Sequence, residues 1–380
     1  MKQVIIEERD LKEGELPVNK IIHGNAFTTL KKLPSESVDC VITSPPFWGL
    51  RDYGTDTKII WNGDPNCNHE WQWKTGGKYT GGTNSIIGQF SDTRTHFTRR
   101  YAICKECGAW YGELGQEPSL ELYIEHLLEI MKELKRVLKK TGIIFWNHGS
   151  HYVRKCDCLQ NYRFILECIE KLDLILRNVI IWHKPNAIPE SVKDRFSRTY
   201  DSIFMLVKSN DYFFDLDTVR VPAKTKPHAP GWRRETLEAA KQSVGRSDRY
   251  NDPDKIWGNP LGRNPGDVWS IPTQPLPESH FATFPVALIR PLISAGCPEK
   301  ICKQCGRMFR LREKEECGCN AGWKAGIVLD PFCGSGTTPL AALQEGRNFI
   351  GIELNREYCA VSLKRIEPFL KQRRLSSYLL

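Results

Sequence analysis

Short apolar, β-branched runs alternate with segments of helical periodicity along most of this chain. The runs at 20–24 (KIIHG) and 38–43 (VDCVIT) each end at a loop signal, as buried strands do. Apolar residues recur at helical spacing between 120 and 138, and GIIFWNHG at 142–149 then returns to a strand pattern. Because strands that alternate with helices build parallel sheets, the sequence predicts an α/β fold with a doubly wound, mostly parallel sheet.

Three segments interrupt this alternation. Residues 54–115 are rich in Cys, Trp and Gly and show little periodicity, which predicts an irregular insertion. Residues 215–280 are polar, basic and rich in Pro and Gly, and residues 297–320 are rich in Cys. A length of 380 residues suits one large domain with insertions, so we expect a single domain over 1–380.

The composition narrows the class of protein. No run of 18 apolar residues exists, so we expect no membrane span. The charged amino-terminal segment has no apolar signal core, which favours a cytoplasmic protein. The 14 cysteines then point to metal binding or plain burial before disulfides, although an oxidising or thermophilic setting would favour disulfides. A net charge of +9 suits a polyanionic partner, as it would in many unrelated proteins.

The segment GIVLDPFCGSGTT at 326–338 reads as a strand, a glycine turn and the start of a helix near Thr337. Glycines such as Gly334 and Gly336 let a ligand approach the backbone, and a helix N-terminus attracts an anion. In a nucleotide site that anion is phosphate, and in S-adenosylmethionine it would be the methionine carboxylate. The loop has neither the lysine of a phosphate-binding loop nor dinucleotide spacing. Glu353 ends the next strand and suits ribose hydroxyls. An ordinary strand–helix turn is the alternative.

The segment TSPPF at 43–47 directly follows a buried strand. Two prolines hold an extended, stiff backbone. An amino group conjugated to a base is a poor nucleophile, and two acceptors that grip its hydrogens would free its lone pair. The Ser44 hydroxyl and the Pro45 carbonyl could be those acceptors, with Phe47 stacked on an extruded base. A proline-rich turn without chemistry is the alternative.

Together, TSPPF and DPFCGSGTT resemble the catalytic and cofactor motifs of amino-methylating DNA methyltransferases, in the order of the beta arrangement of that family. The resemblance implies a seven-stranded, Rossmann-like methyltransferase sheet that binds S-adenosylmethionine, a flipped base and direct methyl transfer. Asn25 stands where the family often has an aspartate. The candidate catalytic residues are Ser44, Pro45, Pro46 and Phe47. The candidate cofactor-binding residues are Asn25, Asp330, Phe332, Gly334, Gly336, Thr337, Glu353 and Asn355.

Within the family, serine before the two prolines is usual for cytosine enzymes, so Ser44 favours the 4-amino group of cytosine over the 6-amino group of adenine. Methylation of RNA or of protein is a further alternative. A non-catalytic nucleic-acid binder built on cysteine knuckles is the rival outside the enzymes, but it would need neither motif.

The region 215–280 occupies the place of the family's target-recognition region. Between Arg220 and Arg263 it carries ten Lys and Arg against five Asp and Glu, with aromatic residues between them. Such side chains suit phosphates and base edges, which predicts contact with duplex DNA. A homodimer and a cognate restriction endonuclease are both open alternatives as partners. The candidate DNA-binding residues are Arg220, Lys224, Lys226, Arg233, Arg234, Arg246 and Arg249.

Two groups of cysteines have the spacing of metal ligands. The first candidate zinc set is Cys302, Cys305, Cys317 and Cys319. The second joins Cys67 and His69 to Cys104 and Cys107, across the insertion. Four protein ligands leave no open position, so either zinc would be structural. Buried thiols or disulfides are the alternatives.

Overall fold

The computed structural model describes residues 4–49, 58–75, 100–153, 155–223, 259–274, 284–313 and 317–378. Its centre is a nine-stranded sheet in the order β1-β2-β18-β17-β3-β8-β12-β11-β13. Neighbouring strands are parallel, except that β12 is antiparallel to both β8 and β11. The strands are β1 (Ile5–Glu7), β2 (Lys20–His23), β3 (Val38–Thr43), β8 (Leu138–His148), β11 (Ile175–His183), β12 (Tyr200–Val207), β13 (Val268–Ser270), β17 (Ile327–Asp330) and β18 (Asn348–Glu353).

The predicted doubly wound, mostly parallel sheet is confirmed in the seven strands from β2 to β11. The strand count itself needs a correction, because β1 and β13 extend the sheet at its two edges. Each of these edge strands has only three residues and is at most half-buried. Strands this short, without a buried face, give no readable alternation of apolar and polar residues.

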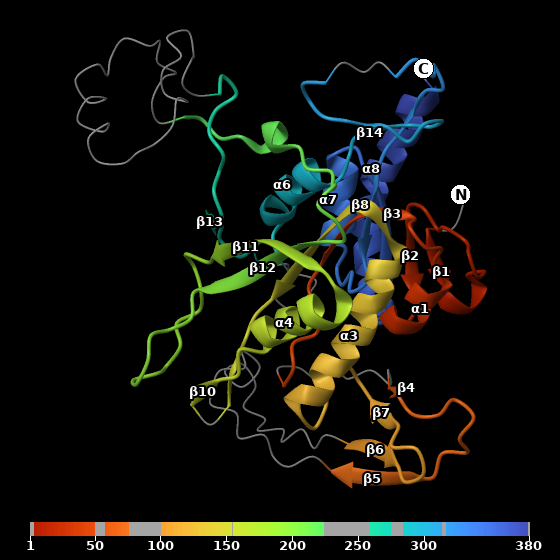
Figure 1. The fold of residues 1–380 in the computed structure, drawn as a ribbon, viewed down its shortest axis with the longest axis vertical. Helices are drawn as coiled ribbons and strands as arrows, with labels where there is room; N and C mark the ends of the chain where they lie inside the picture. The colour runs from red at the N-terminus through yellow and green to blue at the C-terminus, as the bar shows by residue number, and fades with distance from the viewer. Residues whose placement is uncertain are drawn as a thin grey trace.

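Helices cover both faces of the sheet (Figure 1). Adjacent residues of a strand point to opposite faces. Accordingly, Val41 of β3 joins the core under one helical layer, while Cys40 and Ile42 join the core under the other. The first layer is α1 (Ala26–Lys32), α3 (Leu120–Val137) and α4 (Gln160–Leu172), and the second is α6 (Val286–Gly296), α7 (Thr337–Gln344) and α8 (Arg356–Tyr378). Two 3-10 turns are η1 (Glu8–Asp10) and η2 (Leu216–Val219).

The insertion is more regular than the sequence predicts. Its described parts form an antiparallel sheet in the order β4-β7-β6-β5, from β4 (Ile59–Trp61), β5 (Trp71–Thr75), β6 (Arg100–Cys104) and β7 (Trp110–Gly112). The prediction of an irregular insertion over 54–115 is therefore wrong for these residues. The strands are short, and β4 and β5 pair with partners from the far end of the insertion, so no local pattern reveals them.

Two smaller sheets complete the described chain. One joins β14 (Lys300–Cys302), β15 (Met308–Phe309) and β16 (Trp323–Lys324), and the other pairs β9 (Tyr152–Val153) with β10 (Cys156–Asp157). Among the described helices, none has both the length and the apolar character needed to cross a membrane.

The sheet topology locates a crevice. From β17 the chain passes through α7 to β18 on one side, whereas from β3 it passes through α3 to β8 on the other. In an open α/β sheet, ligands bind outside the carboxyl ends of the strands where the order reverses in this way. The crevice between the ends of β3 and β17 is therefore the first place to look for a site.

Candidate active site at the carboxyl ends of β3 and β17

The loop Ser44–Phe47 leaves β3 at this crevice. The strand is buried along its length, and Thr43 at its end donates a hydrogen bond to Oδ1 of Asp330 over 2.7 Å. This contact joins the loop after β3 to the loop after β17. Ser44 is half-buried, and its hydroxyl oxygen accepts from Nδ2 of Asn147, at the end of β8, over 3.4 Å. The serine oxygen is thus held at the crevice next to the cofactor loop.

A relay of buried hydrogen bonds fixes the Pro46 carbonyl. The Tyr123 hydroxyl donates to that carbonyl over 2.7 Å and lies 3.2 Å from Nε2 of His148. Burial lowers the pKa of His148 to about 3, so its ring is neutral at physiological pH. Because Nδ1 of His148 accepts from the Trp146 indole, Nε2 carries the proton and donates to Tyr123. The relay holds the second proline of the loop in one orientation.

Loss of the Tyr123 hydroxyl should loosen this proline. We expect Tyr123→Phe to lower kcat by about tenfold, because a lost buried hydrogen bond of about 1.4 kcal/mol corresponds to that factor. The dissociation constant for the cofactor should stay within twofold of wild type. The matched control is Tyr162→Phe, whose hydroxyl lies 3.5 Å from Ser202 and away from the loop. An unchanged kcat for Tyr123→Phe, or an equal loss in the control, would contradict this role.

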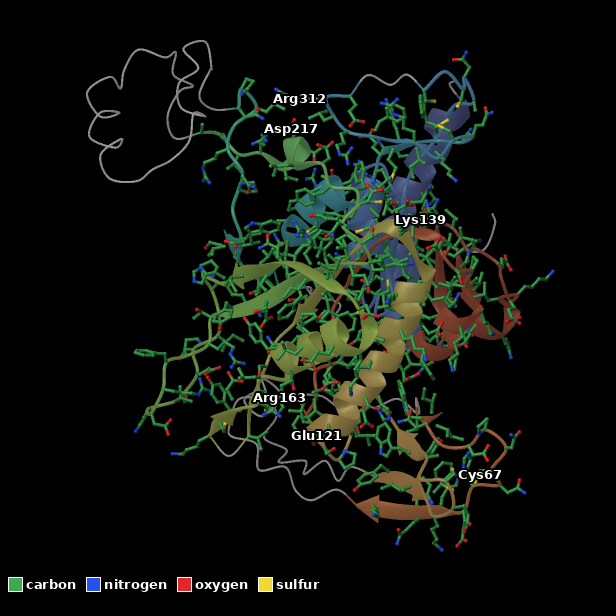
Figure 2. The ribbon with its side chains drawn as sticks, viewed as in Figure 1. Cys67, Glu121, Lys139, Arg163, Asp217 and Arg312 are labelled. Carbon is green, nitrogen blue, oxygen red and sulfur yellow. The ribbon has the colours of Figure 1, made fainter. Side chains whose placement is uncertain are left out.

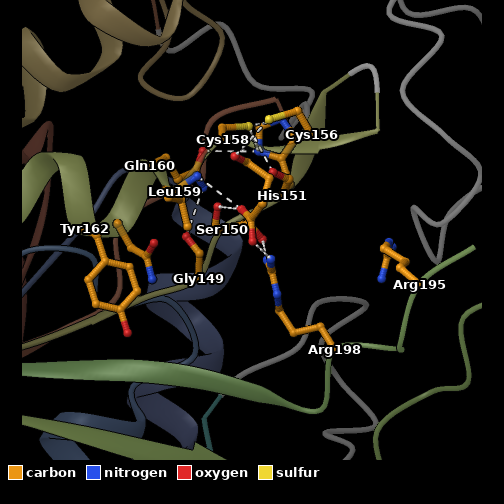
Figure 3. A network of polar contacts seen from close by, with 12 residues as sticks. Gly149, Ser150, His151, Cys156, Cys158, Leu159, Gln160, Tyr162, Arg195 and Arg198 are labelled. Atoms are coloured by element: carbon orange, nitrogen blue, oxygen red, sulfur yellow. Dashed lines mark hydrogen bonds and ion pairs between the residues drawn. The ribbon is translucent and has the colours of Figure 1, made fainter.

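Phe47 is positioned by the segment that follows β8. Its ring lies 5.0 Å from that of His148, and a Cβ added to Gly149 would come within 2.9 Å of it. Gln160 donates to the Gly149 carbonyl over 3.0 Å, and Arg198 bonds the Ser150 carbonyl, as Figure 3 shows. The backbone beside Phe47 is therefore anchored from two other elements, α4 and the β11–β12 connection.

The loop after β17 has the form expected of a cofactor loop. Helix α7 begins at Thr337, with Gly336 as its N-cap at φ +80°. The amide of Gly334 donates to a Glu353 carboxylate oxygen over 2.6 Å, which ties the loop to the end of β18. Arg365 of α8 donates to the Ser335 carbonyl over 2.7 Å and to the Thr337 hydroxyl over 3.1 Å. The turn is thus held by contacts from the end of β18 and from α8.

Asp330 carries an unused acceptor at this loop. The residue is only 1% exposed, and its Oδ1 accepts from Thr43 and from the Phe332 amide. Its Oδ2 is buried and has no hydrogen-bond partner among the described residues. Burial raises the pKa of Asp330 to about 6, against the lowering effect of the nearby Thr338 and Thr43 hydroxyls. A Cβ added to the nearby Gly334 would meet no atom closer than 4.0 Å. A buried carboxylate oxygen beside open space fits the ammonium group of S-adenosylmethionine.

The other predicted cofactor residues lie along the same edge. Asn25 caps α1, because its side-chain oxygen accepts from the Phe27 amide over 2.8 Å. Asn355 caps α8 in the same way, and its own amide donates to Glu353 over 2.7 Å. Burial raises the pKa of Glu353 to about 7. Phe332 approaches Trp146 edge-on at 6.5 Å. The structure therefore brings all eight predicted cofactor residues to the carboxyl ends of β2, β17 and β18.

Four residues of this site escape sequence reasoning: Tyr123, Asn147, His148 and Arg365. Tyr123 fits the helical spacing of the apolar residues of α3, and the other three lie within β8 and α8 without a motif around them. The sequence feature that could have marked two of these residues is the run Trp146–Asn147–His148 at a strand end, because buried polar residues there need hydrogen-bond partners. Asn147 keeps such a need, because its Oδ1 is buried without a partner among the described residues.

Of the predicted DNA-binding residues, only Arg220 falls in the described chain. It pairs with Asp217 over 2.5 Å and donates to the Gly262 carbonyl over 3.2 Å. The guanidinium thus links the two ends of its own region, and a contact of Arg220 with DNA stays a prediction. Lys224, Lys226, Arg233, Arg234, Arg246 and Arg249 lie outside the described residues. On the β11–β12 connection, Phe196 is 97% exposed between basic residues.

Both predicted metal sets assemble in space. Cys67, His69, Cys104 and Cys107 form one group, and Cys302, Cys305, Cys317 and Cys319 form another. In each group the ligand atoms lie within 4.8 Å of one another. Both groups are outside the crevice, so their chemistry is separate from that of the site.

Comparison with known proteins decides the family. The model of the family N6_N4_Mtase, described as "DNA methylase", matches residues 38–364, which include both loops. The chain belongs to the N6/N4 DNA methylase family. It is therefore an S-adenosylmethionine-dependent DNA amino-methyltransferase.

Relatives of this DNA methylase align along nearly its whole length. The Type II methyltransferase M.Cfr9I of Citrobacter freundii is 30% identical over 93% of this chain and 89% of its own. The DNA adenine methyltransferase YhdJ of Escherichia coli is 27% identical over 91% and 82%. Among solved structures, PvuII DNA methyltransferase (cytosine-N4-specific) matches with a TM-score of 0.52 at 17% identity, covering 91% of this chain and 85% of that one. That structural match supports the fold alone.

Proposed function

We propose that this DNA methylase acts at a specific sequence in duplex DNA and methylates the 4-amino group of cytosine. The observation that carries the proposal is the half-buried Ser44 hydroxyl at the end of β3, joined to the cofactor loop through the 2.7 Å contact between Thr43 and Asp330. A hydroxyl at this place accepts a hydrogen bond from an amino group without adding a charge. The target base leaves the duplex to reach it, because an enzyme cannot reach the reacting atom of a base that is stacked inside a duplex.

The residues of the crevice divide the chemistry between them. The Ser44 hydroxyl and the Pro45 carbonyl accept the two amino hydrogens, which draws the nitrogen out of conjugation and frees its lone pair. Phe47 stacks on the extruded ring, and Pro46 is held by Tyr123 so that the loop stays extended. S-adenosylmethionine supplies an electrophilic methyl group when bound. After transfer, the positively charged amino nitrogen loses a proton to solvent.

The cofactor is held by the loop after β17 and the strand ends beside it. When the cofactor is bound, Oδ2 of Asp330 would accept from its ammonium group, and the N-terminus of α7 at Thr337 would stabilise its carboxylate. Glu353 accepts from the ribose hydroxyls through the lone pairs left by its backbone contacts. The remaining residues of the proposed cofactor site are Asn25, Phe332, Gly334, Gly336 and Asn355.

This assignment predicts a pH dependence of cofactor binding. The pKa of Asp330 without ligand is about 6, and a bound ammonium group favours the ionised carboxylate. Binding therefore releases a proton near this pH, and the dissociation constant should fall as the pH rises from about 5 to about 7.5. Isothermal titration calorimetry across this range measures it. In Asp330→Asn, the change in the dissociation constant that is centred near pH 6 should vanish. An unchanged pH profile in that variant would contradict the contact between Asp330 and the ammonium group.

The choice of base is tested on genomic DNA. The protein is expressed in a bacterial host, and modified positions are read by single-molecule sequencing, with Ser44→Ala as the control. We expect modified cytosines at one short sequence, absent from the control. Modified adenines would favour the alternative, methylation of the 6-amino group, which the similarity to the adenine enzyme YhdJ keeps in view.

The positions of the modified bases in the genome would also reveal the recognition sequence. We propose that the basic region 215–280 reads it, with Lys224, Lys226, Arg233, Arg234, Arg246 and Arg249 as contacts to phosphates and base edges. Because M.Cfr9I is named as a Type II methyltransferase, we also propose that a cognate restriction endonuclease shares this sequence.

A further inference from the structure

Two groups of sulfur ligands remain unused by the methyl-transfer site. The first thiol group is Cys67, His69, Cys104 and Cys107, in the insertion, and the second thiol group is Cys302, Cys305, Cys317 and Cys319, between α6 and β17. All 14 cysteines of the chain are free thiols. Neither group touches the crevice, so each needs a reason of its own.

The first thiol group has the spacing of ligands around a tetrahedral ion. Sγ of Cys67 lies 3.8 Å from Sγ of Cys104, and Sγ of Cys107 lies 3.4 Å from Nδ1 of His69. Zinc–sulfur bonds of about 2.3 Å at tetrahedral angles place two sulfurs about 3.8 Å apart, and a sulfur and a nitrogen about 3.5 Å apart. A disulfide would require a sulfur–sulfur distance of about 2.05 Å.

Both groups are built on the same turn. The sequence Ile-Cys-Lys-x-Cys-Gly occurs at 103–108 and again at 301–306. In each copy the glycine amide donates to the carbonyl of the first cysteine over 3.1 Å, and the glycines, Gly108 and Gly306, have φ of +74° and +73°. This turn points two sulfurs the same way and requires the left-handed backbone that glycine allows. Its double occurrence, each time facing two further ligands, indicates a shared purpose.

The remaining ligands come from separate short segments. In the second thiol group, Cys317 and Cys319 flank Gly318, which has φ +70°. In the first, Cys67 and His69 precede β5, and the Cys104 amide donates to the Ala109 carbonyl over 2.8 Å, which closes the turn opposite them. In each group, two segments contribute two ligands each, as in many structural metal sites.

We propose that each thiol group binds one structural zinc ion, as a Cys₃His site in the insertion and a Cys₄ site before β17. Thiolate and imidazole ligands select zinc over magnesium or calcium, which prefer oxygen. Because four protein ligands close the coordination sphere, neither ion takes part in methyl transfer.

The two ions would crosslink two small sheets that bury little apolar surface of their own. The insertion contributes Trp61 and Trp110 to the main core, where both stack on His126 of α3. Its ligands lie in the loop before β5, where Figure 2 labels Cys67, and in the turn at the end of β6. Small sheets of this kind rarely hold together on apolar burial alone, and a metal replaces the missing core.

The ions also lie at opposite ends of the sheet. The carbonyl of Gly115, the last residue of the insertion, accepts from the Gly49 amide beside the catalytic loop over 2.9 Å, so the first thiol group belongs to the active-site end. The second thiol group precedes β17 in the chain and so lies toward the amino end of that strand. The two sites can therefore be lost independently of each other.

The test is a metal count on the full-length protein, purified without added metal and measured by inductively coupled plasma mass spectrometry. We expect two zinc ions per chain. Cys107→Ser and Cys319→Ser should each retain one, whereas the matched control Cys156→Ser, at an exposed thiol outside both groups, should retain two. Less than one zinc per chain in the wild type, or a full count in both ligand variants, would overturn the proposal.

A second measurement on the wild type covers the case in which a ligand variant fails to fold. A mercurial thiol reagent added to the native protein should release two zinc ions to a colorimetric chelator. In a separate sample without the mercurial reagent, the metal-free, denatured chain should titrate as 14 thiols without reductant. A lower thiol count with no zinc released would mean disulfides and would overturn the proposal.

Discussion

Ser44→Ala is expected to lower the rate of methyl transfer by at least about 10²-fold, the usual effect of removing a hydrogen-bonding group that acts on the reacting atoms. The substitution removes the hydroxyl that accepts an amino hydrogen, so the nitrogen lone pair stays conjugated with the base. Cofactor binding should be nearly unchanged, because Asp330 keeps its contact with Thr43 and its free Oδ2. Pro46→Ala should have a similar effect by releasing the extended backbone.

Single-turnover kinetics with labelled cofactor measure this loss separately from binding. The matched control is Ser37→Ala, since Ser37 lies just before the opposite end of β3 and donates to the Pro34 carbonyl over 2.7 Å. That variant should keep its turnover. A Ser44→Ala enzyme that works within about twofold of wild type would remove the loop from the chemistry.

Substitution of alanine at the two glycines of the cofactor loop should have different effects: Gly334→Ala should weaken cofactor binding, and Gly336→Ala should destabilise the fold. At Gly334, with φ +52°, an added Cβ meets no protein atom closer than 4.0 Å but enters the space proposed for the cofactor. We expect a folded protein, at a cost of about 1–2 kcal/mol for the left-handed backbone, that binds the cofactor more than tenfold more weakly. At Gly336 the Cβ would lie 2.0 Å from the Ser362 hydroxyl and 3.0 Å from the Ser362 Cα. Overpacking and backbone strain together should destabilise that variant by about 3 kcal/mol or more.

Thermal unfolding and calorimetry on the two variants separate these effects. Gly336→Ala should show a clear drop in Tm, and Gly334→Ala a small one with nearly lost binding. Each variant thus serves as the control for the other, because both add one methyl group to the same turn. Wild-type affinity in Gly334→Ala would mean that the cofactor lies elsewhere.

The parts of the site that could be predicted from the sequence are the contiguous ones. TSPPF and DPFCGSGTT each carry a strand end, a turn and its chemistry within a few residues, so their side chains share an edge once the strands are parallel. The contacts that hold these loops come from distant segments. Tyr123 reaches Pro46 from α3, and Arg365 reaches Ser335 from α8, and no local pattern marks either one.

The same reason explains the correction to the fold. The insertion's sheet depends on pairing between β5 and β6, whose sequences are separated by the residues between 75 and 100. In contrast, the cysteine sets were predictable, because ligand spacing within each pair is local even when the pairs are far apart.

We predict that the loop after β3 presents a base amino group to S-adenosylmethionine. The chemical identity of the methylated nucleoside tests this prediction. The purified protein is incubated with labelled cofactor and mixed-sequence duplex DNA, and the digested nucleosides are identified by mass spectrometry. We predict N4-methylcytosine as the product. A 6-methyladenine product would keep the mechanism and overturn the assignment of Ser44 to cytosine. A methyl group on a ring carbon, as in 5-methylcytosine, would contradict the account, because the hydroxyl and carbonyl acceptors would then have no amino group to act on.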